Sequence, residues 1–343
     1  MKAKNEKIKK ESSKIEWVYR AKGLGILLVV AGHILRGLNN ANLFSGSVFT
    51  NIDYVLYTFH MPLFFFLSGI FFLRSLKKRG LKSFLLNKVN LLLYLYIIWS
   101  IIQLIVQVLL NKYINGHADF KDFLEILYLP KGQMWFLYVL LLIFIINAFI
   151  FSKFSEGYKN FILTISIIVG IYLRVITIED YYVIDKLSAN FLFFQLGIMW
   201  SMLSFKSSLN SVNYFFAAIA MVLVFTAVTY FNINNNRLDY DNQIIAAIVG
   251  ILLISLISQV IKLKTLYSLG KFSLQIYLAH ILFASGARIF LHKFLNVTDI
   301  YLHIIAGITF GVFGPLVLVR ISEKYKIFKF LFENKIKKIN VTD

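Results

Sequence analysis

The sequence contains no cysteine, so it can form no disulfide bond, no thiolate metal site and no cysteine nucleophile. It is also poor in proline, with three residues, and in acidic residues, with 17 against 36 lysines and arginines. It has neither a Walker-type phosphate loop nor a histidine pair with zinc-ligand spacing, and no serine lies in a nucleophile-elbow pattern. These absences argue against such chemistry, and we expect no bound metal.

Apolar residues are what the sequence has in abundance. They make up 59% of the 343 residues, 34 of which are phenylalanine, and the mean hydropathy is +0.72. A soluble domain of this length can build its core with less apolar surface, so the composition indicates a multi-pass membrane protein. Apolar runs of about 17 to 25 residues predict an all-α polytopic bundle of about ten transmembrane helices. Their approximate limits are 18–37, 52–73, 84–111, 134–151, 159–176, 187–204, 212–231, 243–261, 271–291 and 300–320.

Positive charge is distributed unevenly between the loops. One set of loops comprises the two terminal segments and the loops that follow even-numbered spans, and it holds most of the 36 lysines and arginines. Loops rich in these residues stay in the cytoplasm, so we expect both termini there and the protein in the plasma (inner) membrane. The net charge of +19 therefore reflects topology and attraction to anionic membrane lipid, and we expect no nucleic acid as a partner.

The chain is expected to form one transmembrane domain, residues 18–320, between two basic cytoplasmic tails, residues 1–17 and 321–343. The first apolar run lacks a small-residue cleavage site, so it is expected to remain as a signal anchor. No convincing internal repeat is found. The sequence leaves the oligomeric state open.

The segment "KGLGILLVVAGH" places a histidine deep in the first span. His33 follows Lys22 by eleven residues, so a helix carries it about 16 Å from that charge and roughly halfway through a membrane core. Eleven residues make almost three turns, so both side chains project in nearly the same direction. Ionisable groups at this depth are costly and are candidates for function. The alternative is a histidine that only fixes helix packing, beside Gly23, Gly25 and Gly32, which permit close approach of a neighbouring helix.

The second span contains a polar face and a proline. Asp53, Tyr57 and His60 follow i, i+4, i+7 spacing and share one side of the helix. Pro62 cannot donate a backbone hydrogen bond, which frees the carbonyl of Thr58 and favours a kink beside the histidine. The pattern fits either a structural kink or the wall of a cavity.

The ninth span repeats this spacing with Ser273, Tyr277 and His280 on one face, and Arg288 follows two turns further out. A helix-packing network and a substrate-facing role explain the pattern equally well. The stripe Gly307, Gly311 and Gly314 in the last span predicts a small-residue packing seam. Of the remaining histidines, His117 and His292 are expected in or beside outward loops, near solvent, whereas His303 lies near the outer end of the last span and is left without a role.

Four segments occur in the order and spacing of a known family. "KGLGILLVVAGH", "FHMPLFFFLSGIFF", "MWFLYVLLLI" and "LGKFSLQIYLAH" resemble motifs of the acyltransferase 3 family of integral membrane proteins. The resemblance covers about residues 15 to 320 and implies a bundle of about ten transmembrane helices. It further implies an O-acyltransferase that moves an acetyl group from acetyl-CoA to a hydroxyl of a cell-surface polysaccharide or its lipid-linked sugar precursor.

The resemblance also implies roles for single residues. The histidine that ends the first motif is the family's proposed catalytic base, and here it is His33. Histidine is the usual general base for activating a hydroxyl, and a buried neutral imidazole can accept its proton. Trp135 could stack on a sugar ring. The residues expected to bind substrate are Lys22, His60, Trp135, Tyr277 and His280.

Coenzyme A is anionic and cytosolic, so its phosphates are expected at a basic cluster on the inner side. This cluster comprises Arg74, Lys77, Lys78, Arg79, Lys82 and Lys88. The alternative is that these charges only set membrane topology.

Two positions depart from the family pattern. Tyr19 stands where members often have an acidic residue, and Asn87, Lys88 and Asn90 stand where they often carry two basic residues. A non-catalytic relative that acts in the assembly of an envelope complex is therefore one alternative. The other is a membrane transporter or flippase that uses the midplane histidines as a proton relay, although no paired broken helices are evident.

Overall fold

The structure is a computed structural model that describes residues 2–112, 119, 121–175, 181–203, 211–239 and 243–333, with only the backbone of residues 2–15, 156 and 211. Within these residues the regular secondary structure is entirely helical, which confirms the all-α class. The α-helices are α1 (Lys2–Asn40), α2 (Ser47–Ile70), α3 (Phe72–Arg79), α4 (Leu81–Lys88), α5 (Tyr94–Leu109), α6 (Asp122–Glu125), α7 (Trp135–Lys153), α8 (Lys159–Val175), α9 (Tyr182–Met202), α10 (Ser211–Asn234), α11 (Ile244–Val260), α12 (Lys264–Lys271), α13 (Ser273–Ile289) and α14 (Ile300–Lys324).

Short π-helical and 3-10 turns lie next to several of these helices. A π-helical turn, Val89–Leu93, joins α4 to α5, and another, Phe290–Phe294, continues α13. Three 3-10 turns complete the described helices: Gly132–Met134, Glu156–Tyr158 and Lys326–Leu331.

Seven stretches of the described residues are long and apolar enough to cross a membrane. They are Glu16–Asn40, Ser47–Arg79, Leu81–Leu109, Gly132–Lys153, Val212–Asn234, Ser273–Phe294 and Ile300–Lys324. The chain is thus a multi-pass membrane protein, but the expected count of about ten spans is not confirmed.

The three remaining predicted spans, 159–176, 187–204 and 243–261, do form helices, namely α8, α9 and α11. α8 and α11 have 17 residues each, about 25 Å of helix against a membrane core of about 30 Å. α9 has 21 residues but carries polar side chains that include Asp185, Lys186 and Asn190.

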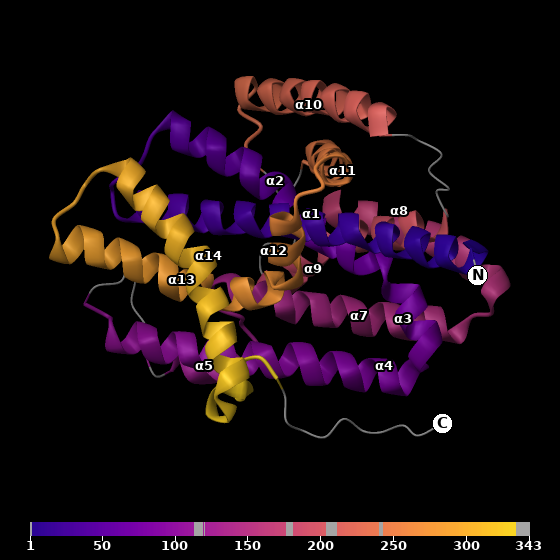
Figure 1. Cartoon of the computed structure of the whole chain (residues 1–343), viewed down its shortest axis with the longest axis horizontal. Coiled ribbons are helices and arrows are strands. Elements are labelled where there is room, and N and C mark those ends of the chain that lie inside the picture. The colour runs from indigo at the N-terminus through magenta and orange to yellow at the C-terminus, as the bar shows by residue number, and fades with distance from the viewer. Residues whose placement is uncertain are drawn as a thin grey trace.

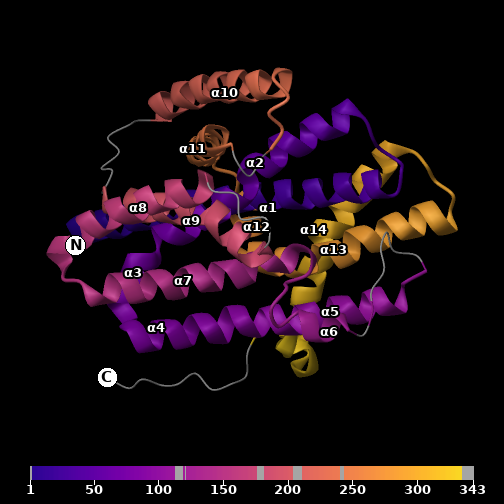
Figure 2. The ribbon, with the colours of Figure 1, turned by 180° about the vertical axis from the view of Figure 1, so that it is seen from behind.

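The long helices place the two kinds of loop at opposite ends of the molecule. The N-terminal part of α1 and the corner between α3 and α4 lie at one end, on the right of Figure 1. The turns at residues 41–46 and 295–299 lie at the other end, and Figure 2 shows the same separation from behind. We call these the basic end and the far end. The charge distribution predicts that the basic end faces the cytoplasm.

α1 is the central helix of the bundle and packs against α2, α11, α12, α13 and α14. Glycines let these backbones approach closely, as expected for the first span. A Cβ atom at Gly23 would meet the main chain of Leu266 in α12, and one at Gly270 would meet the carbonyl of Tyr19. α10 lies at the edge of the molecule beside α11 (Figures 1 and 2).

The predicted packing seam on α14 is confirmed. A Cβ atom at Gly307 would lie 2.9 Å from the side chain of Ile34, and one at Gly311 would lie 3.0 Å from Val30. The seam therefore holds α14 against the half of α1 that carries His33.

Candidate active site

The three midplane histidines, predicted separately on three spans, lie together in the bundle. The rings of His33 and His280 are 5.1 Å apart between centroids. The ring of Tyr57 connects His60 to this pair, because its centroid lies 6.3 Å from that of His33 and 4.5 Å from that of His60. We call these four residues the histidine cluster. It forms where α1 packs against α2 and α13.

Hydrogen bonds within their own helices fix two of these rings. Nδ1 of His60 lies 2.6 Å from the carbonyl of Leu56, and Nδ1 of His280 lies 2.7 Å from that of Tyr277. A carbonyl only accepts, so each Nδ1 carries the proton and donates, which leaves Nε2 as an acceptor. Nε2 of His280 is buried and has no hydrogen-bond partner in the described structure. No hydrogen bond to a described residue orients His33, so neither of its ring nitrogens is held by the described protein.

Arg36 holds the tyrosine of the cluster in place. Its guanidinium forms a bidentate ion pair with Asp53, at 2.6 and 2.8 Å, and lies 3.1 Å from the centroid of the Tyr57 ring. The shared face of Asp53, Tyr57 and His60 is confirmed by these contacts. Arg36 itself was not predicted as a site residue, although its i, i+3 spacing from His33 on α1 is a signal that could have found it.

Two cavities adjoin at His33. The first, of about 450 Å³, is also lined by His60, Gln133, Trp135 and Tyr277. The second, of about 420 Å³, is lined by residues of α1, α5, α13 and α14. His33, Arg36 and Ile281 line both. His33 thus borders both cavities.

The structure brings together most of the residues predicted to form the site. The first cavity is lined by His33, His60, Trp135 and Tyr277. His280 does not line this cavity, but its ring packs against that of His33. Lys22 is the exception, because it lines neither cavity at His33 and its ammonium lies 5.9 Å from the ring of Tyr19. Eleven helical residues put it about 16 Å from His33 toward the basic end.

Gln133 is a site residue that sequence reasoning missed. Its side chain is 4% exposed and lines the first cavity, and its Nε2 is a buried donor with no hydrogen-bond partner in the described structure. The hydroxyl of Tyr277 donates to its main-chain carbonyl, which ties the start of α7 to α13. Its position two residues before Trp135 in "KGQMW" was the available signal.

An ion-pair network fixes the chain just before Gln133. The ammonium of Lys131 binds Asp122, at 3.2 Å, and Glu125, both from α6. The hydrogen bond from Lys131 to Glu125 raises the pKa of this ammonium, which therefore stays charged at neutral pH. The network joins α6 to the N-terminal end of α7 and so holds the position of Gln133.

The predicted coenzyme A residues lie at the basic end. Arg74, Lys78, Arg79 and Lys82 are exposed on α3 and α4. Lys88 is half-buried, and its ammonium lies 3.9 Å from the centroid of the Phe144 ring. Lys77, the remaining member of the basic cluster, is exposed as well, so the cluster has five cations at the surface and one that points into the bundle.

The two departures from the family motifs also have visible surroundings. The ring of Tyr19 lies against Tyr267, at 5.2 Å between centroids, and against the ammonium of Lys22. A cation–π contact thus stands where an acidic residue would form an ion pair. Beside the second departure, the hydroxyl of Tyr94, four residues after Asn90, donates to the carbonyl of Phe330 at 2.9 Å.

Comparison with known proteins then decides the family. The sequence model of the acyltransferase 3 family, described as an acyltransferase domain, matches residues 15–320. The chain belongs to this family. Neither a curated protein nor a solved structure matches it. Membership indicates an acyltransferase, and the apolar helices make this acyltransferase a multi-pass membrane protein.

Proposed function

We propose that this acyltransferase moves an acetyl group from acetyl-CoA to a hydroxyl of a cell-surface polysaccharide or of its lipid-linked sugar precursor. His33 is the general base. The observation that carries the proposal is the position of this imidazole, which faces two cavities and makes no hydrogen bond to the described residues. A base of this kind can approach the hydroxyl that it must deprotonate.

In this reaction the acetyl group moves from the thioester sulfur of acetyl-CoA to the hydroxyl oxygen of the acceptor. The cavity-facing ring nitrogen of His33 takes the proton of the acceptor hydroxyl while the hydroxyl oxygen attacks the thioester carbonyl. The new C–O bond forms, the C–S bond breaks, and the proton passes from the imidazolium to the departing thiolate. The products are the O-acetylated sugar and coenzyme A.

His280 is a positioning residue in this scheme. Its Nε2 lone pair is buried and unpartnered, and its ring lies 5.1 Å from that of His33. A small rotation of His33 lets an N–H of the base donate to this nitrogen. That bond selects one tautomer of His33 and stabilises the imidazolium that forms during transfer.

Gln133 supplies a hydrogen bond to the developing oxyanion. The carbonyl oxygen of the thioester gains negative charge as the hydroxyl attacks, and a preorganised donor in a dry site stabilises that charge. Nε2 of Gln133 is such a donor, because this residue lines the same cavity as His33 and its Nε2 is buried without a partner in the described structure.

The donor approaches from the basic end, and the acceptor from the far end. Phosphates of coenzyme A bind Arg74, Lys78, Arg79 and Lys82, with Lys88 deeper in the bundle. The pantetheine arm then spans the roughly 16 Å that separates Lys22 from His33 along α1. In the first cavity, beside His33, Trp135 offers an aromatic face to a sugar ring.

The test is a transfer assay in membranes that contain the protein. Such membranes, supplied with acetyl-CoA labelled in the acetyl group, should place the label on surface glycan or lipid-linked sugar, as detected by mass spectrometry, while matched membranes without the protein should not. Absence of any labelled sugar, together with proton-coupled solute uptake, would contradict the proposal and favour a transporter.

A further inference from the structure

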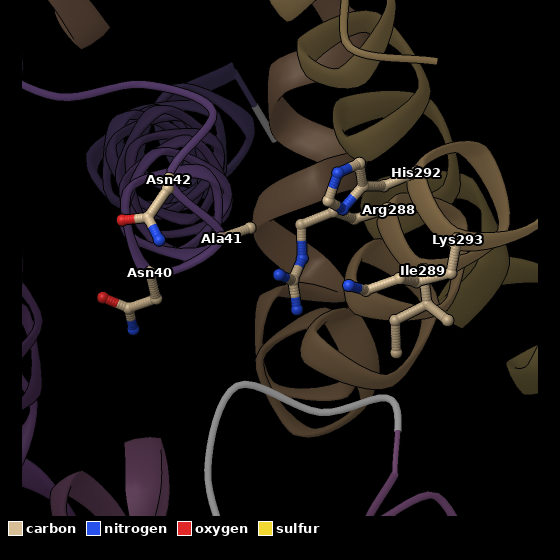
Figure 3. A pocket seen from close by; sticks show the side chains of 7 residues that line it. All are labelled: Asn40, Ala41, Asn42, Arg288, Ile289, His292 and Lys293. Carbon is tan, nitrogen blue, oxygen red and sulfur yellow. The ribbon is translucent and has the colours of Figure 1, made fainter. Parts of the chain in front are cut away.

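A third cavity, of about 180 Å³, lies at the far end between the last residues of α1 and the end of α13 (Figure 3). Asn40 and Asn42 line one side, and Arg288, His292 and Lys293 line the other. Figure 3 shows the guanidinium of Arg288 and the ammonium of Lys293 extending into the space between the two elements. Asn40 and Arg288 also line the second cavity, so the third cavity adjoins the space that reaches His33.

These two cavities present only neutral and positive side chains. Neither is lined by an aspartate or a glutamate. Arg36, at the inner end of the second cavity, is neutralised by its bidentate pair with Asp53. Arg288 and Lys293 differ from Arg36, because they have no carboxylate partner among the described residues and their charges are not neutralised.

Arg288 is the most informative of these cations because of where it lies. It is half-buried in a helix that is apolar enough to span a membrane, and one guanidinium nitrogen, Nη1, donates to the carbonyl of Gly37 at 3.0 Å. A neutral carbonyl orients a guanidinium without cancelling its charge. A charge in a membrane helix without a counter-ion is costly and marks a ligand pathway. The planar set of N–H donors fits the two oxygens of a carboxylate or phosphate.

We propose that Arg288, Lys293 and His292 bind an anionic group, phosphate or carboxylate, that the acceptor carries. The assignment of this group to the acceptor rests on the proposed acyl transfer. Arg288 follows His280 by eight residues, or about 12 Å along α13. This separation exceeds the width of one sugar ring. The anionic group, a phosphodiester or a uronate, therefore belongs to a unit of the acceptor next to the one whose hydroxyl reacts at His33.

The binding site is tested without catalysis. Protein in nanodiscs of zwitterionic lipid is titrated calorimetrically with inorganic phosphate, glucuronate and the neutral sugar glucose. We expect at least one anion to bind the wild type and glucose not to compete with it. Arg288→Gln should weaken anion binding at least about tenfold, and Lys293→Gln should weaken it less, because each removes a charge-assisted hydrogen bond. Arg288→Lys should retain part of the affinity, and Arg237→Gln, at an exposed cation outside these cavities, should retain all of it.

Equal binding of the anions by wild type, Arg288→Gln and Lys293→Gln would overturn the site, as would failure of both anions to bind the wild type. Lys293 is exposed, so its variant gives an answer even where Arg288→Gln does not fold.

A transfer assay then assigns the anion to its source. Labelled acetyl-CoA is offered with oligosaccharides that differ only in a phosphodiester, a uronate or a neutral unit. Arg288→Gln should raise KM at least about tenfold for one anionic acceptor and leave kcat unchanged. Transfer to all three acceptors with an equal KM in both proteins would refute the inference while leaving the proposed acyl transfer intact. Anion binding that depends on Arg288 without transfer to any acceptor would instead refute the proposed function.

Discussion

At the scale of single residues, the sequence selected three imidazoles as candidates but did not show how their surroundings differ. Depth in the membrane selected His33, His60 and His280, and the structure places all three in one cluster. They differ in that carbonyls hold two of the rings and not the third, and sequence spacing does not reveal those bonds. His292, assigned by sequence to an outward loop, lines the third cavity, and His303, left without a role, lines the second.

The proposed oxyanion donor gives a prediction at this scale. Gln133→Leu should lower kcat about a hundredfold with little change in KM, because the lost hydrogen bond forms only as charge develops in the transition state. Steady-state transfer kinetics with labelled acetyl-CoA measure both constants. The matched control is Gln259→Leu, in α11 and outside the cavities at His33, which should behave as the wild type. A change in KM alone would show that Gln133 binds substrate and stabilises no oxyanion.

At the scale of elements, glycines determine how closely α1 approaches its neighbours. The sequence predicted close approach at Gly23, Gly25 and Gly32 but not the partners. The partner of Gly23 is the main chain of α12, whereas Gly25 meets Leu63 and Phe64 and Gly32 meets Tyr57. Periodicity describes one helix at a time, so the choice of partner depends on packing across the whole bundle.

Gly23→Ala should therefore destabilise the bundle. The added Cβ would meet the carbonyl of Leu266, and a main-chain atom cannot move aside as a flexible side chain can. Overpacking of this kind lowers the free energy of unfolding by about 1–3 kcal/mol, and for a clash with the main chain we expect a loss near the upper value. Thermal unfolding in detergent measures the loss. Gly286→Ala is the control, because a Cβ there meets nothing within 4 Å, and equal melting temperatures for the two variants would contradict the close packing of α1 on α12.

At the scale of the whole molecule, hydropathy predicted the helical class and the position of each predicted span. It did not predict how many of these helices are long and apolar enough to cross a membrane. Seven described stretches meet that requirement, because α8 and α11 are short and α9 is polar. The separation of a basic end from a far end agrees with the loop charges. His117 lies outside the described residues, so its expected position in an outward loop stays a prediction.

The predicted topology can be tested with introduced cysteines, because the chain has none of its own. Ser45→Cys, exposed at the far end, should react with a membrane-impermeant maleimide on intact cells. Lys77→Cys, exposed at the basic end, should react only after permeabilisation, since the excess of positive charge predicts that this end lies in the cytoplasm. The reverse pattern would contradict the orientation, and with it the entry of coenzyme A at the basic end.

The most direct test of the account is single-turnover transfer by the wild type and by His33→Gln, with acetyl-CoA affinity measured on both proteins. Glutamine fills similar space but cannot take up the hydroxyl proton. We predict that the rate of transfer falls at least about a hundredfold while the Kd for acetyl-CoA is unchanged. Transfer by His33→Gln at the wild-type rate would contradict the account, because the acceptor hydroxyl would then lose its proton to another group.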